Sequence, residues 1–467
     1  MNAPKSSMTQ DALLAPAMKA LRRLYDRLYL RTAGRMRWVA DVSRCVRRCL
    51  VGTVARVLGA SEVGLYRLRI ARTACRPSAR PSDDAVVASS NGEPRGLPGL
   101  AGRSRTVVLD GCAFQFDGGG VKRFWGAMME EWSRNGFARC VVVLDRGGTA
   151  PRYPGFRYRP VPRLRVNNTA AQRALLEAVC AREGADLFVS TYYTHPMRCP
   201  SLLYVYDMTP EVLGWDLDLP VWREKREAIS YASAYAVASG STMRDLHRLC
   251  PETGDRPVVV DYPAAVSAFH QASVAEVENL RVRLALPQRY VLFIGHREGY
   301  KNAALLFGAL AELGQVPDFG VLLVGGRAVL EPHLARLVPG MPVRIASLSD
   351  EDLRAAYSGA VALVYVSRYE GFGMPILEAK ACGCPVITCR NSSLPEAAGP
   401  DTLFVDESDS AHLVNTLQGL LDGDRSKWTE RGFDWAARFT WVRTARVLED
   451  AIVSACVAGG ESQDLRV

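Results

Sequence analysis

The chain of 467 residues is 48% hydrophobic and 23% charged, as expected of a globular protein with two or three domains. Its formal net charge of +9 is unevenly spread, because residues 1–80 hold 17 Lys and Arg against 4 Asp and Glu. The remainder of the chain is therefore close to neutral. Since no basic face is left there to follow a phosphate backbone, we do not expect nucleic acid as a partner.

The cysteine spacing and the apolar runs of the sequence indicate the cellular compartment of the protein. Twelve cysteines are scattered without a pair of Cys-x2-Cys motifs, so we expect no zinc site. The first twenty residues lack the continuous apolar core of a signal peptide, and no run approaches the roughly 18–20 apolar residues of a membrane span. We therefore expect a cytoplasmic protein with reduced thiols.

Residues 1–75 predict a basic amphipathic helical extension. Apolar residues recur at three- and four-residue spacing, as at Leu21 and Leu24, with arginines between them. Such helices can lie on an anionic membrane surface, which would place residues 12–75 on the inner face of the cytoplasmic membrane. Alternatively, their apolar stripes pack on each other, on the rest of the chain or on a second copy. Residues 76–105, rich in Pro, Ser and Gly, predict a disordered linker.

Alternating strands and helices over residues 106–287 predict an N-terminal Rossmann-like domain. Its first strand, Thr106–Asp110, leads through a glycine-rich loop into a helix. Gly119 and Gly120 in that loop would let the backbone come close to a ligand. Further strands are expected over 140–144, 186–190, 202–206, 234–238 and 258–263, and helices over 121–132, 170–181 and 222–231.

Residues 288–440 predict a second doubly wound domain, and residues 441–467 a last helix and tail. Ser349 is expected to cap the helix that follows it. The expected strands of this domain are 289–295, 319–326, 343–346, 361–366 and 402–406, and the expected helices are 303–313, 350–358 and 411–421.

A strand, a glycine-rich loop and a short helix follow one another over residues 361–387. This arrangement turns backbone N–H groups and the positive end of a helix toward an anion at the carboxyl edge of a sheet. Glu370 and Glu378 bracket the loop. Two carboxylates beside an anion site favour a ligand that has hydroxyls as well as phosphates, such as a nucleotide sugar.

The pattern Glu370-x7-Glu378 with Gly-Phe-Gly-Met-Pro between, together with the segment Ser393–Gly399, resembles the donor site of retaining GT-B glycosyltransferases. In particular it resembles glycosyltransferase family 4, the group 1 glycosyl transferases. The resemblance covers roughly residues 106–460 and implies a GT-B fold, in which two Rossmann-like doubly wound α/β domains face a cleft. The N-terminal domain would hold the acceptor and the C-terminal domain the donor. Residues 441–467 would form the crossing helix that returns to the first domain.

The resemblance also implies roles for single residues. Glu378 would hold the ribose hydroxyls of a nucleotide-diphosphate sugar, and Glu370 would hold the hexose hydroxyls. Glu370 is also expected to be a catalytic residue. The full set of expected donor-binding residues is Gly119, Gly120, Gly371, Phe372, Gly373, Met374, Pro375, Ile376 and Glu378.

Two cations and an acid complete the expected site. Arg297 and Lys301 lie at a strand–loop–helix junction, where they would stabilise the departing diphosphate. Lys301 fits the family pattern directly, whereas Arg297 fits with a shift of one because His296 occupies the usual arginine position. Tyr206-Asp207 would line the acceptor side, where many family members carry His-Asp. Asp207 either contacts a sugar or caps a helix.

The implied activity is transfer of a mannose- or glucose-type hexose, with retention and without a metal or other cofactor, to a saccharide or lipid-linked saccharide in surface polysaccharide biosynthesis. One alternative is a non-catalytic GT-B scaffold tethered by its basic N-terminus. Another, NAD-dependent oxidoreduction, would require Gly-x-Gly-x-x-Gly after the first strand, which is absent. The triplet Asp216-Leu-Asp218 resembles a metal-binding motif, but it precedes Pro220 instead of ending a strand, so we expect no metal there.

Overall fold

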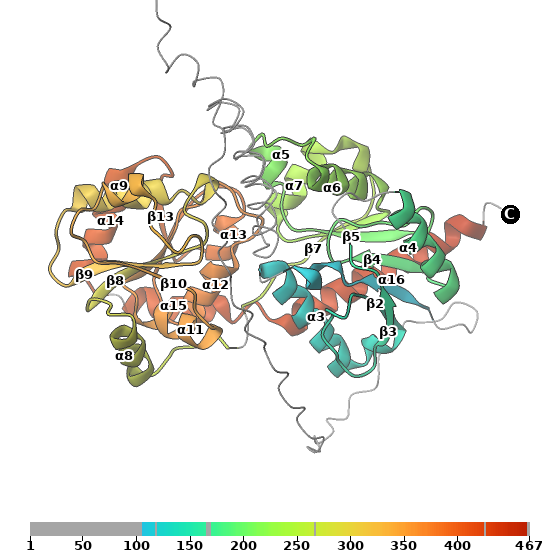
Figure 1. Ribbon diagram of the computed structural model, residues 1–467, viewed down its shortest axis with the longest axis horizontal. Coiled ribbons are helices and arrows are strands. Elements are labelled where there is room, and N and C mark those ends of the chain that lie inside the picture. Colours follow the sequence, from blue (N-terminus) through green and yellow to red (C-terminus); the bar gives the residue numbers. More distant parts are fainter. Residues whose placement is uncertain (1–104, 117–118, 165–169, 266–267, 425, 465–467) are drawn as a thin grey trace, which may run out of the picture. The chain divides into compact units, whose positions relative to one another are not determined.

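The computed structural model describes two parallel β-sheets connected by helices (Figure 1). The expected extension over residues 1–75 and nearly all of the expected linker over residues 76–105 lie outside the described residues. No helix among the described residues is long and apolar enough to cross a membrane. The described residues are 105–116, 119–164, 170–265, 268–424 and 426–464.

The first sheet has the strand order β3-β2-β1-β4-β5-β6-β7, and the described neighbours pair in parallel. Asp110 lies opposite Leu144 of β2 and Ser190 of β4, so the carboxyl ends of three strands meet at one edge. The strands are β1 (Val107–Asp110), β2 (Val141–Arg146), β3 (Arg157–Val161), β4 (Leu187–Ser190), β5 (Ser201–Val205), β6 (Ala234–Val237) and β7 (Val258–Val260).

The second sheet has the order β10-β9-β8-β11-β12-β13, again with parallel pairing between the described strands. All residues of its inner strands β9 and β11 are buried, as expected for a parallel sheet covered on both faces. The strands are β8 (Arg289–Ile294), β9 (Phe319–Val324), β10 (Val343–Ala346), β11 (Ala362–Tyr365), β12 (Val386–Cys389) and β13 (Leu403–Val405).

Helices cross between successive strands, as parallel pairing requires. Around the first sheet these are η1 (Cys112–Gln115), α3 (Gly120–Asn135), η2 (Phe137–Cys140), α4 (Ala170–Glu183), α5 (Thr209–Val212), α6 (Pro220–Tyr231), α7 (Gly240–Leu249) and η3 (Pro251–Thr253). The later helices are α8 (Val274–Arg283), η4 (Gly299–Lys301), α9 (Ala303–Leu313), α10 (Pro332–Ala335), α11 (Asp350–Gly359), α12 (Met374–Ala381), α13 (Leu394–Ala398), α14 (Ser410–Asp422), α15 (Ser426–Ala436) and α16 (Trp441–Asp464).

Helix α16, red in Figure 1, packs on α3 and on strands β4, β5 and β6 of the first sheet. Its Thr444 hydroxyl donates to the carbonyl oxygen of Tyr262 at 2.8 Å. About one turn further along the helix, the Asn135 amide of α3 donates to Glu449 Oε1 at 2.6 Å. The last helix of the chain is therefore fixed to elements that come early in the sequence.

Several elements were not expected from the sequence, among them strands β3 and β12 and helices α8 and α15. Strand β3 is largely exposed at the sheet edge and contains Pro160, so it has neither the apolar run nor the alternation of a typical strand. Helix α8 begins after Ser273 with a complete capping box, in which Ser273 and Glu276 exchange side-chain and backbone hydrogen bonds. By contrast, Ser349 caps α11 as expected, its hydroxyl accepting from the Asp352 N–H.

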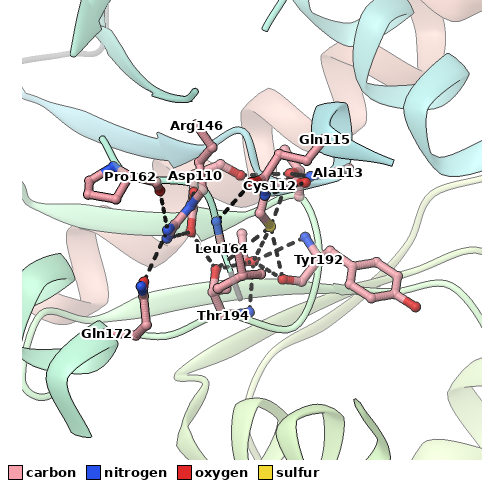
Figure 2. A network of polar contacts seen from close by, with 12 residues as sticks. Asp110, Cys112, Ala113, Gln115, Arg146, Pro162, Leu164, Gln172, Tyr192 and Thr194 are labelled. Carbon is pink, nitrogen blue, oxygen red and sulfur yellow. Dashed lines mark hydrogen bonds and ion pairs between the residues drawn. The ribbon is translucent and has the colours of Figure 1, made fainter. Parts of the chain in front are cut away.

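A buried ion pair joins the carboxyl ends of β1 and β2 (Figure 2). Both side chains are fully buried, and the Arg146 guanidinium donates two hydrogen bonds of 2.7 Å to the Asp110 carboxylate. Thr194 also donates to this carboxylate, at 2.7 Å. Burial, reinforced by the Asp110 carboxylate, raises the pKa of Cys112 to about 12. The Cys112 thiol therefore stays protonated and serves in packing, not as a nucleophile.

Removing one partner of the Asp110–Arg146 pair leaves an uncompensated buried charge. We expect Arg146→Met to lower the free energy of unfolding by about 3–5 kcal/mol in chemical denaturation. The matched control is Arg134→Met on α3, whose exposed side chain pairs with Glu130 and Glu131. Exposed pairs contribute about 0–1 kcal/mol, so equal effects of the two substitutions would contradict this assignment.

Candidate active site

The glycine loop after β11 lies directly against the carboxyl end of β5. A Cβ atom on Gly371 would lie 1.9 Å from the carbonyl oxygen of Tyr206 and 2.8 Å from Cβ of Asp207. The carbonyl oxygen of Gly371 also accepts a hydrogen bond of 3.2 Å from the Thr242 hydroxyl, in the first turn of α7. The residue at position 371 must therefore be glycine for this close approach.

The loop continues into α12 through a glycine with positive φ. Gly373 has φ of 115° and serves as the N-cap, and α12 begins at Met374 with Pro375 in its first turn. The Ser393 hydroxyl lies 2.8 Å from the Glu370 carbonyl oxygen and 3.0 Å from that of Phe372, which fixes the loop. Pro375 has no N–H and the Ile376 N–H donates to the Gly373 carbonyl oxygen at 2.9 Å, so this end of α12 can offer an anion the Met374 N–H and the positive end of the helix dipole.

Single side chains of the loop have separate roles. The buried Phe372 ring packs against Tyr262 and Phe439, with centroids 5.6 and 5.8 Å away, so it is part of the core. Ile376 is also fully buried. Only the backbone of these residues can contact a ligand.

Lys301 and Glu370 form an ion pair at this loop. Lys301 Nζ lies 2.5 Å from Glu370 Oε1 and 3.1 Å from the Tyr365 hydroxyl. Burial disfavours the charge on Lys301, but the Glu370 carboxylate, together with Tyr300 and Asp207, outweighs burial and raises the pKa of Lys301. Lys301 is therefore a permanent cation at neutral pH, as stabilisation of a diphosphate would require.

Glu378 is buried and interacts through both carboxylate oxygens. Arg123 of α3 donates to Oε1 at 3.0 Å, and the Tyr357 hydroxyl donates to Oε2 at 2.9 Å. A second nitrogen of Arg123 lies 2.5 Å from Asp350 Oδ1. Burial raises the pKa of Glu378, and the Arg123 guanidinium opposes that shift.

The structure does not bring Arg297 together with Lys301 and Glu370. Its fully buried guanidinium lies 2.7 Å from Glu331 Oε2. Its other nitrogens donate to the carbonyl oxygens of Gly325, Arg327 and Val329, so it holds the loop after β9. The position one residue earlier, which the family pattern gives to arginine, is taken by His296, and a buried arginine at 297 requires its own carboxylate.

Tyr206 and Asp207 lie where the first sheet meets this loop. The buried Tyr206 hydroxyl accepts from Trp125 Nε1 at 2.5 Å and donates to the Thr191 carbonyl oxygen at 2.7 Å, so it is engaged within the protein. Asp207 Oδ1 accepts from the Thr209 N–H at 2.9 Å, although the N-cap of α5 is Met208. The Asp207 side chain is still 34% exposed.

The two glycines expected after β1 differ in their environment. Gly119 has φ of 96°, which only glycine adopts readily, and a Cβ there would meet nothing within 4 Å. Gly120 begins α3, and a Cβ there would lie 3.9 Å from Cε of Met374. The start of α3 therefore approaches the start of α12.

Arg123, Tyr357 and Tyr365 were not expected at this site from the sequence. Arg123 follows Lys122 in the first turn of α3, where positive charge opposes the helix dipole. Two adjacent cations at that position were a usable signal for a nearby acid or anion. The two tyrosines carried no such signal, because aromatic residues in apolar segments are ordinary core residues.

The described residues contain no cluster of three or more His, Cys, Asp or Glu that could hold a metal ion. Asp216 and Asp218 are exposed in a turn, where the Asp218 N–H donates to Asp216 Oδ1 at 3.1 Å. This triplet does not lie at a strand end.

Comparison with known proteins finds similarity to glycosyltransferases. Residues 277–435 match the family model described as "Glycosyl transferases group 1". The chain is 34% identical over 227 residues to O-antigen chain mannosyltransferase B of Escherichia coli, a match that covers 46% of this chain and 59% of that protein. It is 30% identical over 251 residues to D-inositol 3-phosphate glycosyltransferase of Corynebacterium efficiens, covering 50% and 59%. The chain thus spans less than two thirds of either relative.

Solved structures show the fold. Sucrose-phosphate synthase from Thermosynechococcus elongatus superposes with a TM-score of 0.59 at 19% identity, over 76% of this chain and 100% of that chain. WaaG, a glycosyltransferase involved in lipopolysaccharide biosynthesis, gives a TM-score of 0.57 at 16% identity, over 74% and 98%. Together with the two parallel sheets, these likenesses support the GT-B fold, and the family match supports a group 1 glycosyltransferase.

Because of the close approach at Gly371, alanine substitutions at two glycines should have opposite effects on the stability of the protein. We expect Gly371→Ala to destabilise the protein by about 1–3 kcal/mol, because the added Cβ must displace the loop from β5. Gly419→Ala on α14 is the control, since a Cβ there meets nothing within 4 Å. Alanine in a helix interior is favoured over glycine by about 0.5–1 kcal/mol, so the control should stabilise. Urea denaturation of both variants would decide, and a neutral Gly371→Ala would contradict the placement of the loop.

Proposed function

We propose that the protein is a metal-independent retaining hexosyltransferase of glycosyltransferase family 4. The observation that carries this proposal is the pair of acids around one glycine loop, each balanced by a cation: Glu370 by Lys301 and Glu378 by Arg123. A nucleotide-diphosphate sugar supplies hydroxyls for the acids and phosphates for the cations. The family match over residues 277–435, which include both acids and Lys301, supports this reading.

In this proposal, groups of the donor replace the partners that the charged side chains have in the unbound protein. The diphosphate takes the place of Glu370 beside Lys301 and also contacts the N–H group at the start of α12. Glu370, once released, accepts hydrogen bonds from the hexose hydroxyls. Glu378 accepts from the ribose hydroxyls, with Arg123 moving toward the phosphates. Gly371, Gly373, Gly119 and Gly120 let the backbone approach the donor.

Arg297 acts indirectly in this scheme. Because its guanidinium is saturated by Glu331 and by carbonyl groups, we assign it the positioning of the loop that carries Lys301, not contact with the diphosphate. Lys301 and the start of α12 then supply the positive potential at the leaving group.

The proposed chemistry needs no protein base. The bond between the anomeric carbon and the diphosphate oxygen breaks, and a bond to the acceptor oxygen forms on the same face of the sugar. The acceptor proton passes to the departing phosphate oxygen. Glu370 stabilises the sugar through its hydroxyls, and Lys301 stabilises the negative charge that develops on the diphosphate.

For substrates, we propose a UDP- or GDP-hexose donor and a saccharide or lipid-linked saccharide acceptor in surface polysaccharide synthesis. The names of the relatives support this, since one is an O-antigen chain mannosyltransferase and WaaG is involved in lipopolysaccharide biosynthesis. An Anabaena protein of similar fold was solved with UDP and glucose. Residues 106–287 would serve the acceptor and residues 288–440 the donor. Residues 12–75 would hold the protein at the cytoplasmic face of an anionic membrane.

The test is release of nucleoside diphosphate and transfer of labelled hexose across a panel of UDP- and GDP-hexoses with saccharide acceptors. We expect Lys301→Met to lower turnover by about 100-fold or more, because a charge that stabilises the transition state contributes about 3 kcal/mol. Lys427→Met, which removes an exposed lysine of α15, should leave turnover unchanged.

Two results would contradict the proposal. If the wild-type chain transfers none of the hexoses and binds none of the donors, the alternative of a non-catalytic scaffold is favoured. If Lys301→Met turns over like the wild type, the diphosphate lies elsewhere.

A further inference from the structure

Lys380 on α12 is buried without a carboxylate partner. Its residue is 3% exposed, yet within the described part of the chain its ammonium donates only to the backbone carbonyl oxygen of Asp401, at 3.1 Å. The buried cations Arg146, Lys225 and Arg297 each pair with a carboxylate at 2.7 Å. A buried ammonium with two unused N–H donors is costly unless an acceptor is supplied.

A cavity adjoins this ammonium. It measures about 170 Å³, opens to solvent, and is lined by residues at the ends of α12 and α13 and along α15. That space exceeds the share of one water molecule, about 30 Å³, and is smaller than the usual 300–1,000 Å³ of a site for a drug-sized ligand. We call it the Lys380 cavity, and its lining residues are Lys380, Ala398, Pro400, Asp401, Arg431, Asp434, Trp435 and Arg438.

The charges around the Lys380 cavity favour an anion. Arg431 is paired with Asp401, whereas Arg438 stacks on the Trp435 ring at 5.0 Å from its centroid. Three cations and two acids line the space, which leaves a net positive charge. Lys380 also lies in the last turn of α12, six residues or about 9 Å along the axis from Met374. The Lys380 cavity is thus separate from the donor loop but shares a helix with it.

The walls are held in place without a ligand. Trp435 Nε1 donates to the Ala397 carbonyl oxygen at 2.8 Å, and a Cβ on Gly399 would lie 2.5 Å from the Trp435 ring. On α15, Gly432 lies against Lys380, where a Cβ atom would make an ordinary van der Waals contact of 3.5 Å with Cγ of the lysine. A preformed cavity lowers the entropic cost of binding.

We propose that the Lys380 cavity binds a phosphate-type oxyanion, held by the Lys380 ammonium and by the guanidinium groups of Arg431 and Arg438. The anion would satisfy the two N–H groups of Lys380 that lack an acceptor, and Arg–phosphate contacts are strong and directional. Its source is either free inorganic phosphate or the phosphate group of a sugar phosphate. The proposal does not depend on the proposed sugar transfer.

The competing explanation is that Lys380 only ties the 398–401 segment to α12. The two explanations differ in their pH dependence. Burial lowers the pKa of Lys380 to about 8, against the smaller opposing effect of Asp401. An oxyanion site held by this ammonium must therefore weaken as pH rises through about 8, because the cation is lost. A structural tie predicts no phosphate dependence at any pH.

Isothermal titration of the full chain with inorganic phosphate, and separately with a hexose 1-phosphate, tests the proposal. The Lys301→Met background removes the cation of the candidate active site, so binding there is not counted. In that background, Lys380→Met should weaken binding by about 10- to 100-fold, the value of one charge-assisted hydrogen bond. Arg438→Gln, at an exposed side chain, should weaken it in the same direction without affecting folding. Lys427→Met is the control and should bind as the background does.

Each outcome of these titrations either supports or overturns the proposed phosphate site. Binding of either phosphate that is lost with Lys380→Met, and that falls between pH 7 and pH 9, supports the site, and the tighter ligand identifies the source. Absence of binding at tens of millimolar, or equal affinity in the Lys380→Met and Lys427→Met variants, overturns it. If Lys380→Met does not fold, an unchanged affinity in Arg438→Gln overturns the proposal by itself.

Discussion

A charged side chain that is removed from water needs an oppositely charged partner, and this requirement determines how the side chains of the site are arranged. Glu370 is held by Lys301, and Glu378 by Arg123 and Tyr357, before any ligand arrives. Each ion pair offsets part of the free-energy cost of removing these groups from water. In the proposed reaction, a donor that brings phosphates and hydroxyls together is the ligand that can satisfy all four groups at once. The same constraint explains why the buried Arg297 pairs with Glu331. It also makes Lys380 unusual, because this buried cation has no carboxylate partner among the described residues.

The charged side chains can pair only because backbone segments from different strands approach each other closely. Parallel strands of one sheet end at a common edge, so the loops that follow β8 and β11 lie together at the carboxyl edge of the second sheet. Gly371 then lets the loop after β11 touch the carbonyl oxygen of Tyr206, a contact that any Cβ would prevent. The Asp207 carboxylate is consequently near enough to Lys301 to contribute to the rise in its pKa. Side chains from both sheets thus act on one cation.

Much of this arrangement could be predicted from sequence, because it depends on local patterns. Apolar runs gave strands such as β8 and β11, and Ser349 was correctly expected as a cap. Lys301 and Glu370 were expected at one site, and the structure brings them together. Contacts between distant segments were not predictable: nothing local shows that Arg123 reaches Glu378 or that Arg297 turns to Glu331. Strand β3 was missed because an exposed edge strand with a proline lacks the apolar pattern.

The central claim is that a nucleotide sugar displaces Glu370 from Lys301. A crystal structure of the chain with a UDP- or GDP-hexose bound would test it most directly. The account predicts that Lys301 Nζ moves from Glu370 to within hydrogen-bond distance of a diphosphate oxygen, while Glu370 accepts from hexose hydroxyls and Glu378 from ribose hydroxyls. A bound donor that leaves the Lys301–Glu370 pair intact, with its phosphates elsewhere, would contradict it.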